Sequence, residues 1–215
     1  MPRVVAINVA VIPIKKLFTV PVIHFVEQGT VAALGLSRPH MPYKALIMSI
    51  LISPMIVPLI ITAAGMFFFY AKINLVYTFT GIILAHIALS TPFVVITVTA
   101  TLVGFDMNMV KASQSLGARP LRTFFKVIMP LILPGVISGA LFAFITSFDE
   151  VVIVMFMASL DQLTIPKQMW AGIRQEISPV ILCMATCLVA LSIFLLTTVE
   201  LLRRRSEKMR GITRR

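Results

Sequence analysis

The sequence predicts an all-α membrane protein. Hydrophobic residues make up 59% of the chain and charged residues only 13%, whereas a soluble domain carries about 25% charged residues. The mean hydropathy is +1.00. Four runs lack Asp, Glu, Lys and Arg and are long enough to cross a bilayer as helices: Ala45–Tyr70, Ile73–Phe105, Val127–Phe148 and Ile177–Val199. Isolated strands are excluded because lipid leaves the edges of a sheet unpaired.

Positive charge is unevenly distributed between the predicted loops. If the C-terminal tail 203–215 is cytoplasmic, four alternating spans put the loop 105–126 and the linker with Arg38 and Lys44 on the same side. That side carries thirteen basic residues and the opposite side three, which is the bias that sets membrane orientation. The net charge of +11 therefore indicates membrane topology rather than nucleic-acid binding.

The N-terminal segment 1–28 is atypical. Val4–Ile14 is too short to span a bilayer. Leu17–Ser37 is long enough, but it contains Glu27, and a central acid costs about 2.5–3.5 kcal/mol on insertion. This segment is predicted to be a marginal fifth helix. A cleavable signal peptide is not expected, because the basic pair Lys15 and Lys16 follows the apolar run instead of preceding it.

The first two clear spans contain helix-breaking and polar residues. Pro54 and Pro58 lie four residues apart, which predicts a kink. That kink fits either a tolerated contact between helices or a flexing pore helix. The second span contains His86 and the sequence Ser90-Thr91-Pro92. A histidine inside the membrane is a functional candidate, but a hydrogen bond to a neighbouring helix explains it equally well.

A polar stretch, Phe105–Gly135, separates the second and third spans. Residues 107–116 are mostly good helix formers, Gly117 can end a helix, and Pro120 can begin a second short one. This pattern predicts a helix–turn–helix hairpin at the membrane surface. A basic loop can serve only to set orientation, but the internal order of this one favours docking to a partner.

The third span begins after Pro130 and Pro134. Gly135 and Gly139 predict a face of small residues suited to close helix packing. Asp149 and Glu150 follow near the opposite interface, and neighbouring helical positions point about 100° apart. The two acids fit either a helix break in the headgroup region or a carboxylate lining a path for a cationic substrate.

The remaining segments carry no enzymatic pattern. Trp170 suits the membrane interface. Cys183 and Cys187 lie one helical turn apart, too few for a metal site and unsuited to a disulfide, so they indicate packing inside the membrane. The sequence contains no P-loop, GxSxG, HExxH or CxxC motif. We therefore expect no cofactor on this chain, and any ATP would be bound by another chain.

The hairpin resembles the cytoplasmic coupling loop of permease subunits from binding-protein-dependent ABC importers. That motif is Glu-Ala-Ala, three residues, Gly, nine residues, then Ile-x-Leu-Pro. Here Lys111-Ala112-Ser113, Gly117 and Val127-Ile128-Met129-Pro130 have the same spacing. The flanking sequences Ser147-Phe148-Asp149-Glu150 and Thr164-Ile165-Pro166 are similar to the spermidine/putrescine-type subgroup.

The resemblance implies a type I permease domain over 29–205, with a coupling loop at 105–130 and a basic cytoplasmic tail at 206–215. It implies a bacterial inner-membrane location, a dimer of cytoplasmic ATPase subunits, a second permease subunit, an extracytoplasmic binding protein and surrounding lipid. The implied coupling residues are Lys111, Ala112, Ser113, Gly117, Ala118, Arg119, Pro120, Arg122 and Pro130. The implied substrate-path residues are Asp149, Glu150 and His86.

Because the sequence departs from the family pattern at two places, three functional hypotheses stay open. Lys111 replaces the acidic first residue of the motif, which reverses a charge on the expected docking surface. Residues 1–28 do not resemble the helices that precede Gly29 in the family, so the sequence predicts an N-terminally shortened permease. The favoured function is a polyamine permease. The alternatives are an inactive permease remnant and a membrane scaffold or channel-like protein that does not use ATP.

Overall fold

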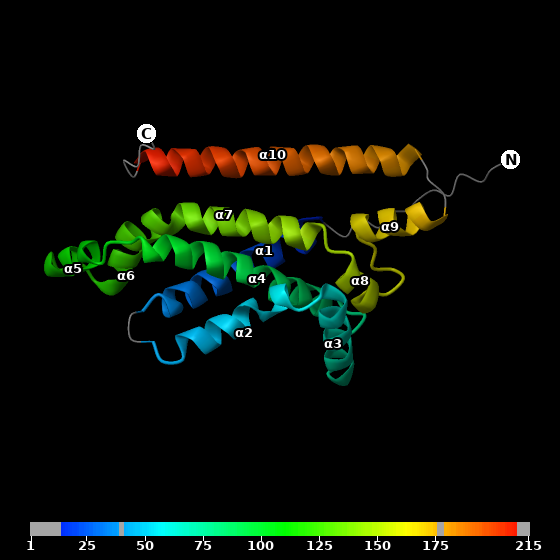
Figure 1. The fold of residues 1–215 in the computed structure, drawn as a ribbon, viewed down its shortest axis with the longest axis horizontal. Helices are drawn as coiled ribbons and strands as arrows, with labels where there is room; N and C mark the ends of the chain where they lie inside the picture. Colours follow the sequence, from blue (N-terminus) through cyan, green and yellow to red (C-terminus); the bar gives the residue numbers. More distant parts are fainter. Residues whose placement is uncertain (1–13, 39–40, 176–178, 210–215) are drawn as a thin grey trace.

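The structure is a computed structural model, and it describes residues 14–38, 41–175 and 179–209. Every regular element in these ranges is helical (Figure 1), as the sequence predicts. The elements are α1 (Ile14–Leu36), α2 (Lys44–Ile56), α3 (Leu59–Lys72), α4 (Phe79–Val103), α5 (Asn108–Ser115), α6 (Pro120–Thr123), the π-helical turn η1 (Phe124–Ile128), α7 (Met129–Phe148), α8 (Val152–Met157), α9 (Ile165–Gln175) and α10 (Pro179–Met209).

Within the described ranges, two helices are long and apolar enough to cross a membrane. They are α4 and the continuous helix Pro120–Phe148. The predicted span Ala45–Tyr70 is instead divided into α2 and α3, which meet at an angle of 106° and would add a third span. Pro58 supplies no N–H at this break, so the helix stops at Ile56 and starts again at Leu59. A shorter apolar stretch, Leu182–Thr198, lies in α10.

The centre of the molecule is a bundle of α1, α4 and α7. Phe25 of α1, Val94 of α4 and Ile132 of α7 are fully buried in one apolar cluster. The predicted face of small residues is confirmed, because a Cβ on Gly139 would come within 2.9 Å of the Val94 backbone. The absence of side chains here lets α7 approach α4 closely. The segment predicted to be marginal, α1, is therefore a packed core helix.

We expect Gly139→Val to destabilise the bundle by about 1–3 kcal/mol, because the added side chain must push α7 away from the α4 backbone. Thermal unfolding of the purified chain in detergent measures this change. Gly65→Val is the matched control, since no heavy atom lies within 4 Å of a Cβ at Gly65 in α3. Equal melting temperatures for the two variants would contradict the close approach of α4 and α7.

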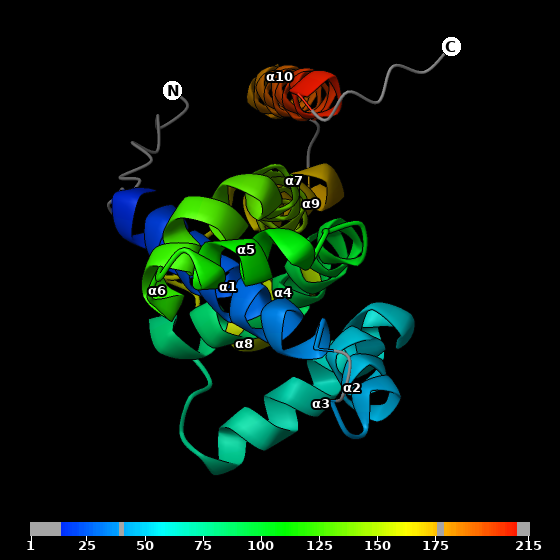
Figure 2. The same ribbon diagram turned by 90° about the vertical axis from the view of Figure 1, so that its left-hand side faces the viewer.

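The last helix, α10, lies alongside α7 and apart from the other spans (Figures 1 and 2). It packs mainly against α7 and α9. Cys183 and Cys187 are exposed on it, within its apolar stretch, and their packing inside the membrane stays a prediction. The helix continues to Met209, and the Arg204 guanidinium lies 2.8 Å from the Glu200 carboxylate. The first residues of the predicted tail therefore extend α10.

The hairpin and the α8–α9 segment lie at opposite ends of the molecule. In Figure 1, α5 and α6 are at one end of the long axis, while α3, α8 and α9 are at the other. The helices α4 and α7 connect these two ends. A movement of the hairpin can therefore reach the far end through two packed helices.

Candidate coupling site

The hairpin turn is built by backbone hydrogen bonds around Gly117. This glycine has a φ of +79°, in the left-handed region. The Ala118 N–H donates to the Ser113 carbonyl at 3.1 Å, and the Gly117 N–H donates to the Gln114 carbonyl at 2.9 Å. These two bonds form a Schellman ending, which satisfies the last carbonyls of α5. The predicted helix stop at Gly117 is confirmed.

The second arm begins as the sequence predicts and then continues without a loop into α7. Pro120 occupies the first turn of α6, where its missing N–H needs no partner. The arm passes through η1, in which the Met129 N–H donates to the Phe124 carbonyl. Pro130 causes this wider turn, since it lacks the N–H that would bond Lys126 in an α-helix. Because the helix is continuous, any rotation of the hairpin acts directly on α7.

A side-chain hydrogen bond joins the two arms of the hairpin. The hydroxyl groups of Ser113 in α5 and Thr123 in α6 lie 2.9 Å apart, and Thr123 is only 2% exposed. Sequence reasoning missed Thr123, because a partner ten residues away leaves no periodic signal. This bond and the turn at Gly117 tie the two arms of the hairpin to each other.

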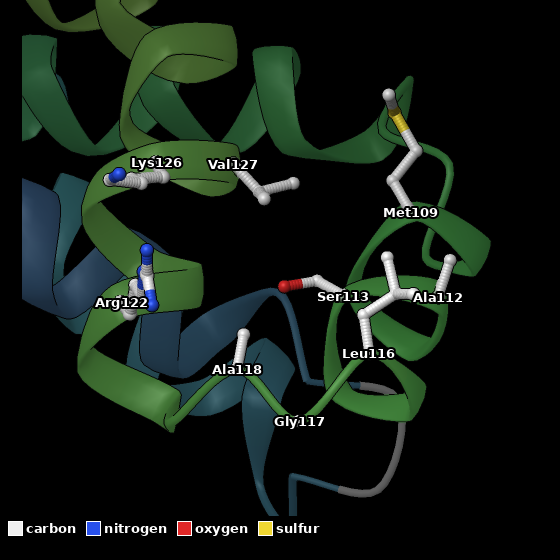
Figure 3. A pocket seen from close by; sticks show the side chains of 9 residues that line it. All are labelled: Met109, Ala112, Ser113, Leu116, Gly117, Ala118, Arg122, Lys126 and Val127. Atoms are coloured by element: carbon white, nitrogen blue, oxygen red, sulfur yellow. The ribbon is translucent and has the colours of Figure 1, made fainter.

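A groove of about 600 Å³ lies between α5 and the arm formed by α6 and η1 (Figure 3). It is lined by five of the predicted coupling residues: Ala112, Ser113, Gly117, Ala118 and Arg122. Val127 points into the groove from the second arm, and Lys126 also lines it. The other predicted coupling residues, Lys111, Arg119, Pro120 and Pro130, do not line this groove, and all four are exposed.

The exposed side chains of the hairpin, some of which line the groove, are apolar and basic. Leu116 is 88% exposed, and Leu121 and Phe125 are also exposed. The cations share this surface, and none of them forms an ion pair with a described residue: Lys111, Arg119, Arg122 and Lys126. Exposed apolar groups beside unpaired cations mark a surface for a partner that carries apolar and acidic groups.

The two acids at the end of α7 have different environments. Asp149 is exposed, whereas Glu150 is buried and its carboxylate accepts a hydrogen bond from the Ile153 N–H at 2.8 Å. Burial raises the pKa of Glu150, and the hydrogen bonds from the Ile153 and Val152 N–H groups oppose this rise. Glu150 therefore has a structural partner at the start of α8, and Asp149 is the accessible one of these two acids.

His86 bonds to a neighbouring helix, which was one of the two interpretations of its sequence context. Its Nδ1 atom lies 3.0 Å from the Ser147 hydroxyl of α7, and the side chain is buried in α4. The bond can run in either direction, depending on which ring nitrogen carries the proton. The structure does not bring His86 together with the hairpin residues.

These features define a helical membrane permease of the ABC-importer class, in which a rigid surface hairpin is continuous with a transmembrane helix. The chain belongs to the family described as binding-protein-dependent transport system inner membrane component, whose model matches residues 29–208. Members of this family are inner-membrane transport permeases rather than enzymes. The chain is accordingly a permease subunit of an ABC importer.

Two of three similar curated proteins cover most of the chain, and the third covers about half of it. The chain is 29% identical over 178 residues to the spermidine/putrescine transport system permease protein PotC of Haemophilus influenzae, which covers 83% of this chain and 69% of that protein. The PotC protein of Escherichia coli K12 is 29% identical over 185 residues, covering 86% and 69%. The putrescine transport system permease protein PotI of Escherichia coli K12 is 35% identical over 103 residues, covering 48% and 37%.

A solved structure has the same fold. A chain of the MetNI methionine ABC transporter, in inward facing conformations, matches with a TM-score of 0.53 and 19% identity. The match covers 94% of this chain and 99% of that chain. The permease fold predicted from the hairpin motif is thereby confirmed at the level of architecture.

Proposed function

We propose that this permease forms the translocation path for a polyamine such as spermidine or putrescine and that its hairpin docks a cytoplasmic ATPase. A pair of ATPase subunits hydrolyses ATP, a second permease subunit completes the path, and an extracytoplasmic binding protein delivers the substrate. The polyamine is suggested by the names of the PotC and PotI relatives. The exposed carboxylate of Asp149 agrees with a cationic substrate.

The proposed coupling to an ATPase rests on the hydrogen bonds that hold the hairpin together. Transmission of force requires a lever that does not deform when it is pushed. The bonds around Gly117 and the Ser113–Thr123 hydrogen bond fix the two arms to each other, and η1 joins them to α7. Closure of the ATPases would then rotate α7, and α4 would follow because it packs closely on α7.

The orientation and the number of spans follow from the same proposal. The hairpin and the C-terminal end of α10 face the cytoplasm, in agreement with the thirteen basic residues predicted on that side. The path is surrounded by four spans: the bent pair α2–α3, α4, the helix Pro120–Phe148, and α10. In this arrangement α1 is a fifth helix packed inside the domain.

We expect the double charge reversal Arg119→Glu and Arg122→Glu to reduce recovery of the ATPase with the tagged permease at least about tenfold. Both side chains are exposed on the hairpin, and like charges placed across an interface cost several kcal/mol. Co-purification of the permease, its second subunit and the ATPase from detergent-solubilised membranes measures the effect. Lys72→Glu is the matched control, because Lys72 is an exposed cation in the last turn of α3, and α3 lies at the opposite end of the molecule from the hairpin.

The same preparation separates the three functional hypotheses. A working importer takes up radiolabelled putrescine or spermidine in proteoliposomes only when ATP and the binding protein are both present. Uptake without ATP would instead identify a channel-like protein. A well-expressed chain that recovers no ATPase and takes up no substrate would identify an inactive remnant.

A further inference from the structure

Buried apolar side chains form two clusters that meet along α4. The first joins Ala63 of α3 to Ile153 and Met157 of α8, and Leu89 from the N-terminal half of α4 belongs to it. The second is the central bundle of α1, α4 and α7, in which α4 contributes Ile87, Val94 and Val98. The N-terminal half of α4 therefore packs on α3 and α8 with one face and on the central bundle with another. We name α3, α8 and the N-terminal half of α4 (79–89) the α3–α8 unit.

Three helices, α2, α4 and α7, connect this unit to the rest of the molecule, and each connection carries a break or a proline. The connection from α2 bends by 106° at Val57 and Pro58. The connection from α7 to α8 is non-helical over 149–151. In α4, which is helical throughout Phe79–Val103, Pro92 follows Leu89 and removes one backbone hydrogen bond. The two breaks and the proline are the places where the unit can change its angle to the bundle.

A ring contact and several hydrogen bonds hold the α3–α8 unit together. The rings of Phe67 in α3 and Phe156 in α8 meet edge to face with their centroids 6.4 Å apart. The Tyr77 N–H donates to the Met157 carbonyl at 2.9 Å. Buried Gln162 donates its amide N–H to the Tyr77 carbonyl at 3.2 Å and accepts the Ser159 N–H at 3.0 Å. These bonds join the two loops that close the unit, so it would move as one body.

The bond between His86 and Ser147 crosses from this unit to α7. His86 lies in the N-terminal half of α4, within the unit, and Ser147 lies in the last turn of α7, two residues before Asp149. We propose that His86 is a positioning residue for transport, which fixes the angle between the α3–α8 unit and α7 through its hydrogen bond to Ser147. This inference rests on the proposed function, since that angle has to change when the path alternates between its two openings.

The position of His86 agrees with an action through Ser147 rather than through the substrate. Only 8% of the side chain is exposed, and its Nδ1 atom is already engaged by Ser147. The same bond holds the end of α7 that carries Asp149. Loss of the bond should therefore slow the change of state, with little effect on the affinity for a cation.

A double-mutant cycle in the complete transporter tests this role. We expect His86→Leu and Ser147→Ala each to lower the maximal uptake rate about tenfold with KM unchanged, and the double variant to be no worse than either single one, because both remove the same bond. His86→Asn should recover much of the rate, since its amide can bond Ser147 from the position of Nδ1. Additive losses would overturn the proposal, as would a raised KM in His86→Leu that Ser147→Ala does not share.

Spin-label distances test the inference without relying on transport. One pair of labels, at Phe68 in α3 and Phe142 in α7, spans the unit and the bundle, and both sites are exposed. The control pair, Phe68 with exposed Met155 in α8, lies within the unit. Cys183 and Cys187 are replaced by alanine so that only the intended sites are labelled. We expect His86→Leu to broaden the distance distribution of the first pair and to leave the control pair unchanged.

The two experiments separate failure of the inference from failure of the proposed function. An unchanged distribution for the pair across the boundary, or equal broadening of both pairs, overturns the inference even in a working importer. If the unmodified complex takes up no polyamine, the proposed function fails, and the label distances alone decide whether His86 fixes the unit to α7.

Discussion

A Gly117→Val permease should still bind its ATPase but should lose most of its substrate uptake per ATP hydrolysed. Gly117 has a φ of +79°, which a β-branched residue adopts only at a cost of about 1–3 kcal/mol. No heavy atom lies within 4 Å of a Cβ placed on Gly117, so the substitution acts through the backbone conformation and not through a clash. When the turn relaxes, the bond from Ala118 to Ser113 is lost and α5 separates from α6. Since about 1.4 kcal/mol corresponds to a factor of ten, we expect uptake per ATP to fall at least about tenfold in proteoliposomes.

The matched control at the same position is Gly117→Asn. Asparagine tolerates the left-handed conformation far better than valine does, so this variant should keep most of its coupling. The two variants add side chains of similar size at an exposed site, and they differ mainly in the backbone conformation that they accept. Normal coupling in the valine variant would rule out a rigid turn as the basis of the lever.

Features of the hairpin that depend on single residue types could be predicted from the sequence. A positive φ is accessible to glycine because it has no Cβ, and proline begins a helix because it has no N–H. Gly117 and Pro120 could therefore be placed in the turn before any contact was known. The charge-free runs were predictable because lipid excludes each charged side chain by itself. The close helix contact at Gly139 was predictable because a residue without a side chain lets two helices approach each other.

Features that depend on tertiary contacts could not be predicted from local patterns. The partner of Ser113 is ten residues away, and the partner of His86 is 61 residues away, on another helix. Pro54 and Pro58 predicted a kink, but its angle of 106° is also affected by the packing of α3 on α8. Adjacent acids gave no signal that one is buried at the start of α8, because burial is decided by how the chain turns after Phe148.

An Asp149→Asn permease should show a raised apparent KM for putrescine, whereas Glu150→Gln should stay close to the unmodified transporter. Asp149 is exposed, so its charge is available to a cation, and a hydrogen bond to a charged group contributes roughly 1.5–3 kcal/mol. Loss of that charge should weaken apparent affinity about tenfold or more. The buried Glu150 has a pKa raised by desolvation, and a glutamine carbonyl can still accept the Ile153 N–H.

The concentration dependence of ATP-driven putrescine uptake distinguishes the two acids. Asp161→Asn is the matched control, because Asp161 is an exposed acid in the nearby sequence between α8 and α9. Neutralising Asp149 and Glu150 together should leave ATPase recovery intact, since both lie at the opposite end of the molecule from the hairpin. A larger effect from Glu150→Gln than from Asp149→Asn would assign the cation to the buried acid, and equal KM values in all variants would remove both acids from the path. The accessible carboxylate is the stronger candidate, because a buried acid already bonded to the backbone must break that bond before it can accept a cation.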